Sequence, residues 1–418
     1  MTDKQDNGNL LPPVRVLDLS DEKGFLCGKI LGDMGADVIK VERPGGDPGR
    51  NIGPFYHDIP DPEKSLFWFA FNGNKRGITL NIEADDGQQI FRQLVKDADI
   101  LIESFNPGYM DGLGLGYPAL NEINPRLIMV SVTPFGQTGP YKDYQASDIV
   151  CMAMAGFMSI CGDGDRPPVR VPVPQAYLSG AADGAAGAMM AYYYRESGHE
   201  GQHVDISIQE SMLSTLIPAI PFWQLDHFHM KRYGSTRLVD QGSSRIVWPC
   251  RDGYVNCFLI GGVTGARTNK PLSEWMEEEG MLPDFMREID WDKFDIGKVT
   301  SSQIGLMEEH IDRFFRRHTK AELYQWAIEK RAMLYPVFNS QDLVEYEQLS
   351  QRGFWVEVDH PELGVTVTYP GAWAISSEAN LSMRRRAPLI GEHNREIYES
   401  ELGITGANLA ILKQSGVI

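Results

Sequence analysis

Two groups of basic side chains have the types and spacing to bind a ligand. The segment ERPGGDPGR places Arg43 and Arg50 in a glycine-rich loop after a predicted strand. This loop is either an anion site or a flexible surface loop. His227 and His229, in HFH, are of a type that ligates metals. Because no cysteine or carboxylate stands at metal-ligand spacing from them, we expect ordinary partly buried histidines and no metal.

Three common motifs of nucleotide and acyl chemistry are missing from the sequence. The turn after the first predicted strand reads SDEKGFLCG and lacks the G-x-G-x-x-G fingerprint, although Glu42 stands at a distance suited to a ribose. No P-loop and no G-x-S-x-G elbow occurs. These absences argue against a Rossmann cofactor, a phosphate-cradling ATPase and an α/β-hydrolase.

A run of small residues from Gly180 to Ala191 follows the bulky Tyr177. Its alanines predict a helix, yet it holds three glycines, each of which costs about 1 kcal/mol relative to alanine in a helix. Such a run is tolerated where the backbone gains from close approach. Asp183 and the following Tyr and Arg residues argue against pairing in a membrane. Tight helix packing and room for a ligand are the two interpretations that stay open.

The elements that would position these residues alternate between strand and helix over the first 150 residues. Buried strands are predicted at 14–19, 37–42, 77–82, 99–104 and 126–132. Helices are predicted at roughly 24–34 and 86–97, which is the order of repeated βαβ units. The predicted fold class is therefore α/β, with a doubly wound, Rossmann-like large domain.

The sequence changes in character near residue 220. A strand is predicted at 251–260, a charged and mostly helical tract at 273–330, and two further strands in WVEVDH and GVTVTYP. We expect a large domain at 1–220, a smaller α+β domain at 221–349, and a C-terminal segment at 350–418 that returns to the large domain.

Composition narrows the classes of partner and compartment. The net charge of −18 at pH 7 disfavours nucleic acid and anionic membranes. No apolar run is long enough to cross a membrane. The five cysteines are irregularly spaced, which favours a reduced cytoplasm over a disulfide scaffold. The opening MTDKQDNGNLLPP lacks the pattern of a signal peptide and predicts a short disordered lead-in.

Several segments in order along nearly the whole chain carry a family resemblance. They are VRVLDLS, LGDMGADVIKVERPGGDPGR, NKRGITLNI, ESFNPGYMDGLGLGY, NPRLIMVSVTPFGQTGPY, GHEGQHVDISIQES and RRAPLIGEHNREI. The chain resembles the class III CoA-transferases, which include formyl-CoA transferase, carnitine CoA-transferase and the α-methylacyl-CoA racemases. The resemblance implies a dimer of two interlocked rings, with active sites between a large and a small domain.

The resemblance also implies a reaction. In this family an Asp carboxylate attacks an acyl-CoA thioester, and the resulting mixed anhydride is opened by CoA. The enzyme then holds CoA as an aspartyl thioester until the acceptor acid takes it. CoA thioesters are thus expected as substrates, with no permanently bound cofactor.

The family's nucleophilic Asp lies 18 residues before the Arg that opens R-x-x-x-G-x-G-Q. Here that pattern begins at Arg195, so the matching residue is Tyr177. A phenol cannot carry CoA as a thioester, and its pKa near 10 keeps it neutral at pH 7. Asp183 lies six residues further on, turned about 120° around the helix and about 9 Å along it, and is a poor substitute.

Other positions depart from the family in the same direction. Cations that meet the CoA phosphates in formyl-CoA transferase match Glu83, Gly112 and Gln145 here, and only Arg43 keeps its charge. The small A-G-P turn of the family has become Lys23-Gly24-Phe25. If the pocket is used, the candidate CoA-binding residues are Arg43, Leu80, Ile82, Ser104, Phe105 and Asn106.

The racemase tripeptide H-D-I reads Ser147-Asp148-Ile149, so racemisation is not expected. The resemblance, together with these departures from it, implies the non-catalytic subunit of a heteromeric class III CoA-transferase whose nucleophilic Asp belongs to a related chain. Benzylsuccinate CoA-transferase is a heteromer of this kind, moving CoA between an acyl-CoA such as succinyl-CoA and benzylsuccinate. A self-sufficient transferase with a rearranged site that uses Asp183, and a binding protein unconnected with CoA, are the alternatives.

Overall fold

The computed structural model describes residues 8–239 and 242–418, and residues 1–7 of the expected lead-in lie outside them. Within the described part, Leu11 is buried and its N–H donates to the Met34 carbonyl at 3.0 Å, so the prediction of disorder is wrong for Leu11. The chain forms two compact units. Unit 1 comprises Met1–Phe157, Arg170–His227 and Glu347–Ile418, and unit 2 comprises Met158–Val169 and Phe228–Tyr346. Residues 158–169, inside the range assigned to the large domain from the sequence, group with unit 2.

Unit 1 is built on a six-stranded parallel sheet in the order β3-β2-β1-β4-β5-β6. Its strands are β1 (Arg15–Asp18), β2 (Asp37–Glu42), β3 (Lys75–Thr79), β4 (Ile100–Glu103), β5 (Ile128–Thr133) and β6 (His203–Ser207). This is the doubly wound Rossmann order, in which successive strands are added in the opposite direction across the sheet from β4 onward, next to β1. The first five strands were predicted, and β6 was not.

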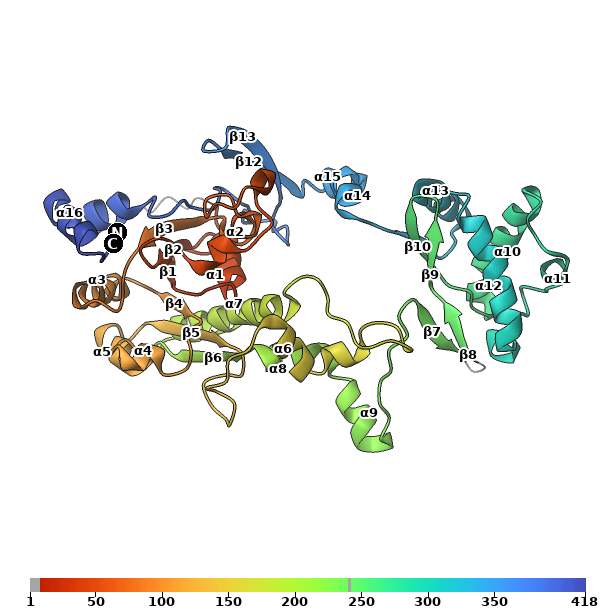
Figure 1. Cartoon of the computed structure of the whole chain (residues 1–418), viewed down its shortest axis with the longest axis horizontal. Helices are drawn as coiled ribbons and strands as arrows, with labels where there is room; N and C mark the ends of the chain where they lie inside the picture. Colours follow the sequence, from red (N-terminus) through yellow and green to blue (C-terminus); the bar gives the residue numbers. More distant parts are fainter. Residues whose placement is uncertain (1–7, 240–241) are drawn as a thin grey trace. The chain divides into compact units, whose positions relative to one another are not determined.

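Helices cover both faces of this sheet (Figure 1). The helices of this part of the chain are α1 (Phe25–Asp33), α2 (Leu66–Asn72), α3 (Asp85–Lys96), α4 (Tyr109–Gly112), α5 (Tyr117–Ile123), α6 (Asp148–Met154), α7 (Gln175–Glu196), α8 (Ile208–Leu213) and α9 (Ala219–Asp226). Of these, α9 has no buried residue and does not cover the sheet. Alternation along the strands assigns the faces. Leu17, Leu101 and Met129 contact the α3 and α5 side, whereas Val130 and Val132 contact α7.

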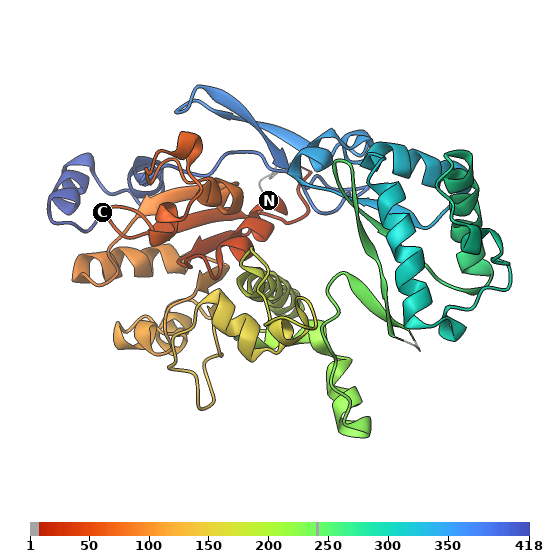
Figure 2. The same ribbon diagram turned by 45° about the vertical axis from the view of Figure 1, so that its right-hand side comes forward.

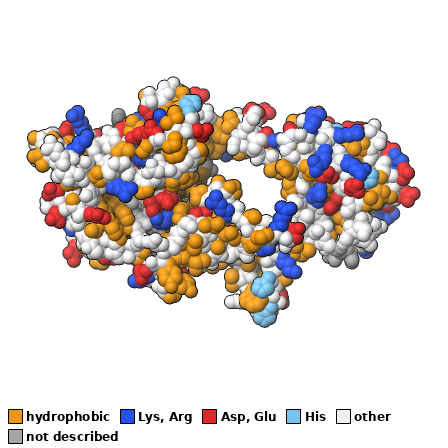
Figure 3. All heavy atoms as spheres, viewed as in Figure 1, with side chains coloured by type: hydrophobic (Ala, Val, Ile, Leu, Met, Phe, Trp, Pro, Cys, Tyr) orange, Lys and Arg blue, Asp and Glu red, His pale blue; other side chains and the backbone are white. Residues whose placement is uncertain are grey.

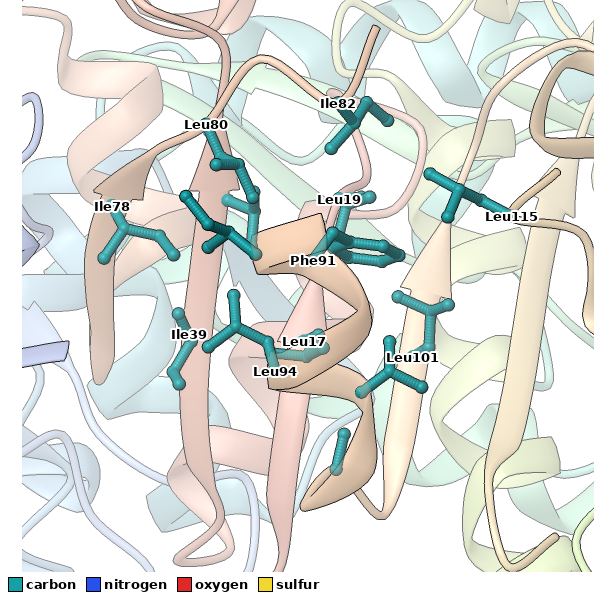
Figure 4. Packing of buried hydrophobic residues seen from close by; sticks show 14 of the residues in the cluster. Leu17, Leu19, Ile39, Ile78, Leu80, Ile82, Phe91, Leu94, Leu101 and Leu115 are labelled. Carbon is teal, nitrogen blue, oxygen red and sulfur yellow. The ribbon is translucent and has the colours of Figure 1, made fainter. Parts of the chain in front are cut away.

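The core on the α3 side extends to the carboxyl ends of the strands. Phe91 and Leu94 of α3 lie over Leu17, Ile39 and Leu101 in the middle of the sheet (Figure 4). Figure 4 also shows three members of the cluster at the ends toward which the strand arrows point, namely Leu19, Leu80 and Ile82. The apolar core therefore reaches the surface at the carboxyl ends of the strands.

The small residues of α7 allow close contact with the sheet and with α8. A Cβ atom added at Gly180 would lie 2.7 Å from Ile208 Cγ1, and one at Gly187 would lie 2.9 Å from Val204 Cγ1. At Gly184 the nearest atoms are those of Val132 and Cys27, at 3.3 and 3.4 Å. Tight packing, one of the two interpretations from the sequence, explains the glycines.

Unit 2 contains a three-stranded antiparallel sheet, a hairpin and helices on one face of the sheet (Figure 2). Its elements are β7 (Thr236–Val239), β8 (Gly242–Arg245), β9 (Val247–Cys250), β10 (Gly253–Cys257), α10 (Gly262–Glu278), α11 (Asp284–Arg287), α12 (Ser301–Phe315), α13 (Lys320–Lys330), β11 (Leu334–Val337) and α14 (Ser340–Glu345). Trp248 and Val255 are buried against the helices, while Tyr254 and Tyr335 are exposed on the opposite face. The helical tract and the strand near 251–260 are confirmed.

The C-terminal part of the chain belongs to unit 1. It contains α15 (Glu347–Gln351), the hairpin of β12 (Trp355–His360) and β13 (Val365–Pro370), a π-helical turn (Glu396–Glu401) and α16 (Gly406–Gln414). Leu409 and Val417 join the core cluster around α3. The two strands predicted here are confirmed.

Candidate active site

A cavity of about 510 Å³ opens at the carboxyl ends of β1, β2, β3 and β4. In doubly wound sheets this edge, at the point where the strand order reverses, is where ligands bind. Five of the six candidate residues line it, namely Arg43, Leu80, Ile82, Ser104 and Phe105. Asn106 is exposed and does not belong to the described lining.

The two arginines of the ERPGGDPGR loop have different surroundings. Arg50 is fully buried, where it donates to Glu42 at 2.6 and 2.7 Å and to Glu63 at 2.8 Å. Its guanidinium also lies 3.9 Å from the centre of the Trp68 ring. Arg43 is exposed, lines the cavity and donates from Nε to the Gly46 carbonyl at 3.3 Å. Only Arg43 of the pair can meet a ligand, because Arg50 is held inside the fold.

The lining of the cavity is rich in carboxylates. Asp21, Glu42, Asp47 and Glu83 line it, and Arg43 is the one cationic side chain among the described lining residues. The other two positions that the resemblance matched to phosphate-binding cations, Gly112 and Gln145, are exposed and also uncharged. The lining as a whole is therefore poorly suited to a polyphosphate.

A buried network of charges holds the loops beneath the cavity. Lys75, which has no exposed surface, donates to Asp18 at 2.7 Å, to the Phe25 carbonyl at 2.8 Å and to Asn72 at 2.9 Å. Lys40 is equally buried and lies 3.4 Å from Asp47. These cations neutralise carboxylates that line or underlie the cavity, so the loops after β1 and β2 are fixed by ion pairs.

Tyr177 lies in the first turn of α7 and is 7% exposed. Its hydroxyl donates to the Ala146 carbonyl at 3.3 Å. Burial raises the pKa of this phenol well above its ordinary value, and the nearby carboxylate of Glu22 raises it further. Tyr177 is therefore neutral at physiological pH. Tyr177 lies near the cavity, because Asp21, which lines the cavity, also raises the Tyr177 pKa through its charge.

Asp148 is a carboxylate of this site that the sequence analysis did not assign. Its Oδ1 accepts the N–H groups of Ala176 and Tyr177 at 2.9 and 3.1 Å, at the start of α7. Its Oδ2 is buried and accepts no hydrogen bond from the described residues. Burial raises the Asp148 pKa, while the two N–H groups lower it. In the sequence, the tripeptide Ser147-Asp148-Ile149 indicated only that the histidine of the racemases is missing, and nothing marked Asp148 as a contact of α7.

Two other carboxyl groups have distinct positions. Asp183 is exposed, whereas Tyr177, Gly180 and Gly184 form part of the buried face of α7. Glu103, at the end of β4, is 3% exposed and accepts the Phe105 N–H at 2.7 Å. Burial raises the pKa of Glu103 to about 7. Asp183 thus faces water rather than the buried surroundings of Tyr177.

The two histidines of HFH lie on the surface. His227 and His229 are both exposed, so the expectation that they are partly buried is wrong, and the His227 ring lies 4.9 Å from that of Trp223. Within residues 8–239 and 242–418, no group of three or more His, Cys, Asp or Glu side chains is arranged to hold an ion. Over the same residues, no helix combines the length and apolarity needed to span a membrane.

Comparison with known proteins shows that the chain belongs to CoA-transferase family III, whose family model matches residues 11–394. It is 38% identical over 395 residues to the BbsE subunit of succinyl-CoA:(R)-benzylsuccinate CoA-transferase from Thauera aromatica, with 92% of each chain covered. It is 30% identical to formyl-CoA:oxalate CoA-transferase from Streptomyces avermitilis, over 98% of this chain and 99% of the other. The predicted family is confirmed, and CoA thioesters are the substrates of such transferases.

A solved structure supports the fold independently. A CAIB/BAIF family protein from Brucella suis matches with a TM-score of 0.82 at 24% identity, covering 94% of this chain and 99% of that one. At this level of identity the likeness concerns the fold alone. The predicted α/β class with a parallel sheet is confirmed.

Proposed function

We propose that this chain is the non-catalytic subunit of a heteromeric class III CoA-transferase. A related chain supplies the nucleophilic Asp, and the complex moves CoA from an acyl-CoA such as succinyl-CoA to an organic acid such as benzylsuccinate. The 38% identity to a subunit of succinyl-CoA:(R)-benzylsuccinate CoA-transferase favours this substrate class. The chain on its own is expected to be inactive.

The observation that carries the proposal is the state of Tyr177. Its hydroxyl is occupied by the Ala146 carbonyl, and burial keeps the phenol protonated. A neutral phenol is a weak nucleophile, and an aryl ester would not hold CoA as the family's aspartyl thioester does. The position that holds the nucleophile in related chains is therefore occupied here by a side chain that cannot act as one.

The surface of unit 1 supports assembly with a second chain. Hydrophobic and histidine side chains gather over α9 (Figure 3). Trp223 is 45% exposed and Leu225 is 80% exposed, and on α7 Met190 and Tyr193 are 69% and 76% exposed. An isolated soluble domain rarely leaves so many large apolar side chains in water. We propose that they are covered in an interlocked dimer with the related chain.

The alternative nucleophile, Asp183, receives little support from its surroundings. It lies off the buried face of α7 that holds Tyr177, so it does not take the position of the family's nucleophile. We therefore place the chemistry on the partner chain.

Co-expression tests the proposal. The chain is purified alone and together with a class III chain encoded beside it that carries Asp at the Tyr177 position. CoA transfer from succinyl-CoA to benzylsuccinate is then followed by liquid chromatography. We expect turnover only by the pair, and none when the partner's Asp is replaced by Asn. Turnover by the isolated chain would refute the proposal.

A further inference from the structure

We propose that a pocket beside the β12–β13 hairpin binds a small oxyanion, a phosphate or a carboxylate, through the guanidinium of Arg385 and the Nε2–H group of His393. This pocket shares no described lining residue with the cavity at the carboxyl ends of β1 to β4. The inference is independent of which chain supplies the catalytic Asp.

The pocket has a volume of about 440 Å³ and is lined by β12 and by the chain segment that precedes the π-helical turn. Three successive arginines of this segment, Arg384, Arg385 and Arg386, line it together with His393. The backbone of the segment is fixed, because Oδ1 of the buried Asn74 accepts the N–H groups of Arg384 and Arg385 at 2.6 and 3.2 Å. The cationic wall of the pocket is therefore held in place by the fold.

The three arginines differ in how their charge is compensated. Arg386 is paired with Glu392, to which it donates at 2.8 and 2.9 Å. Arg384 donates to the Gly32 carbonyl at 2.7 Å, in the last turn of α1. Arg385 is exposed, and no carboxylate of the described residues pairs with it. Its guanidinium is thus the group of the wall that is free to bind an anion.

The tautomer of His393 adds a second donor next to Arg385. Nδ1 of His393 accepts the Gly77 N–H at 3.1 Å, and a backbone N–H can only donate. Burial lowers the His393 pKa, so the ring is neutral and its one proton is on Nε2. This Nε2 lies 3.4 Å from Nη1 of Arg385. Both groups are donors, and neither finds an acceptor among the described residues.

Two adjacent donors without an acceptor indicate an oxyanion. A guanidinium binds a carboxylate or a phosphate through two parallel N–H···O bonds, and the imidazole N–H supplies a third donor. Glu357 and Asp359 of β12 also line the pocket, and Asp359 accepts the Thr366 hydroxyl at 2.6 Å. Because these two carboxylates repel a polyanion, a compact anion suits the pocket.

Calorimetric titration of the purified chain tests the inference with sodium phosphate and with sodium acetate, at an ionic strength held constant with chloride. We expect saturable binding of at least one of them with a Kd of about 1 mM or below. Saturation by phosphate alone would identify the ligand as a phosphate, and saturation by acetate alone would identify it as a carboxylate. The variant R385Q should weaken the affinity at least about tenfold, because it removes charge-assisted hydrogen bonds.

Two further variants separate a built site from a general effect of charge. R385K keeps the charge but loses the planar fork, so it should recover only part of the affinity. The matched control R395Q removes an exposed arginine of the same segment outside the described lining, and it should leave the affinity unchanged. Circular dichroism checks that all three variants fold. Failure of both anions to saturate the chain at millimolar concentration, an unchanged affinity in R385Q, or an equal loss in R395Q would each overturn the inference.

Discussion

Replacing Tyr177 by Asp restores the family's nucleophile and should nevertheless give an inactive, destabilised chain. Aromatic side chains bury about 150–250 Å², and truncating one in a core costs about 3–5 kcal/mol. Tyr177 is 7% exposed, so most of that cost applies. A carboxylate in the first turn of α7 recovers about 0.3–1 kcal/mol from the helix dipole. We therefore expect Y177D to lose about 2–5 kcal/mol in the free energy of unfolding.

The loss should depend on pH in a defined direction. The new carboxyl lies in a buried place near Glu22 and Asp148, so its folded-state pKa is raised above the unfolded value. Below the unfolded-state pKa both states hold the proton and the loss of stability is smallest. As pH rises from the unfolded-state pKa through the folded-state pKa, the unfolded chain releases its proton more readily than the folded chain, so the loss of stability grows.

Urea unfolding at pH 5 and pH 8, followed by circular dichroism, measures this difference. The control Y177F removes only the hydrogen bond to the Ala146 carbonyl and should cost about 0.5–1.5 kcal/mol. An unfolding free energy of Y177D equal to that of the unmodified chain, or CoA-transferase activity in Y177D alone, would refute the reasoning.

Three further substitutions, one of them with a matched control, probe the packing and the buried charges of the fold. G180A forces a Cβ atom to within 2.7 Å of Ile208 and should destabilise by about 1–3 kcal/mol in thermal unfolding, whereas G305A, with nothing within 4 Å, should gain up to about 1 kcal/mol; equal shifts would contradict the packing argument. K75M removes the nearer of the two cations beside the buried Asp18 carboxylate, the other being Lys40 at 3.9 Å, and should cost about 3–5 kcal/mol in urea unfolding; an unchanged midpoint would show that the ion pair is dispensable. E103Q removes an acid whose folded-state pKa of about 7 lies above its unfolded-state pKa. The free energy of unfolding of E103Q relative to that of the unmodified chain should therefore increase from pH 5 to pH 8, and a constant difference would contradict that pKa.

The large sheet was predictable because the strands of a buried parallel sheet are nearly continuous apolar runs. VRVLDL and RLIMVSV have this form, and β1 and β5 lie within them or overlap them closely. The exception is β6, where HVDIS alternates polar and apolar residues and only Ser207 is buried. An edge strand with that pattern resembles a loop in sequence.

The cavity was partly predictable for a geometric reason. Residues that directly follow parallel strands meet at one edge of the sheet, so Arg43, Leu80 and Ser104 converge although they are far apart in the chain. Tyr109, which also lines the cavity, was missed because its position depends on a contact with Glu83, 26 residues away, which no local pattern reveals. The contact between Asp148 and the Ala176 N–H spans 28 residues and was missed for the same reason.

We propose that the covalent step takes place on a related chain and not on this one, and intact-mass spectrometry of the two-chain complex after incubation with succinyl-CoA tests this claim. We expect a CoA adduct on the partner chain only, with the mass of this chain unchanged. An adduct on this chain, whether at Asp183, Asp148 or another carboxyl group, would contradict the claim.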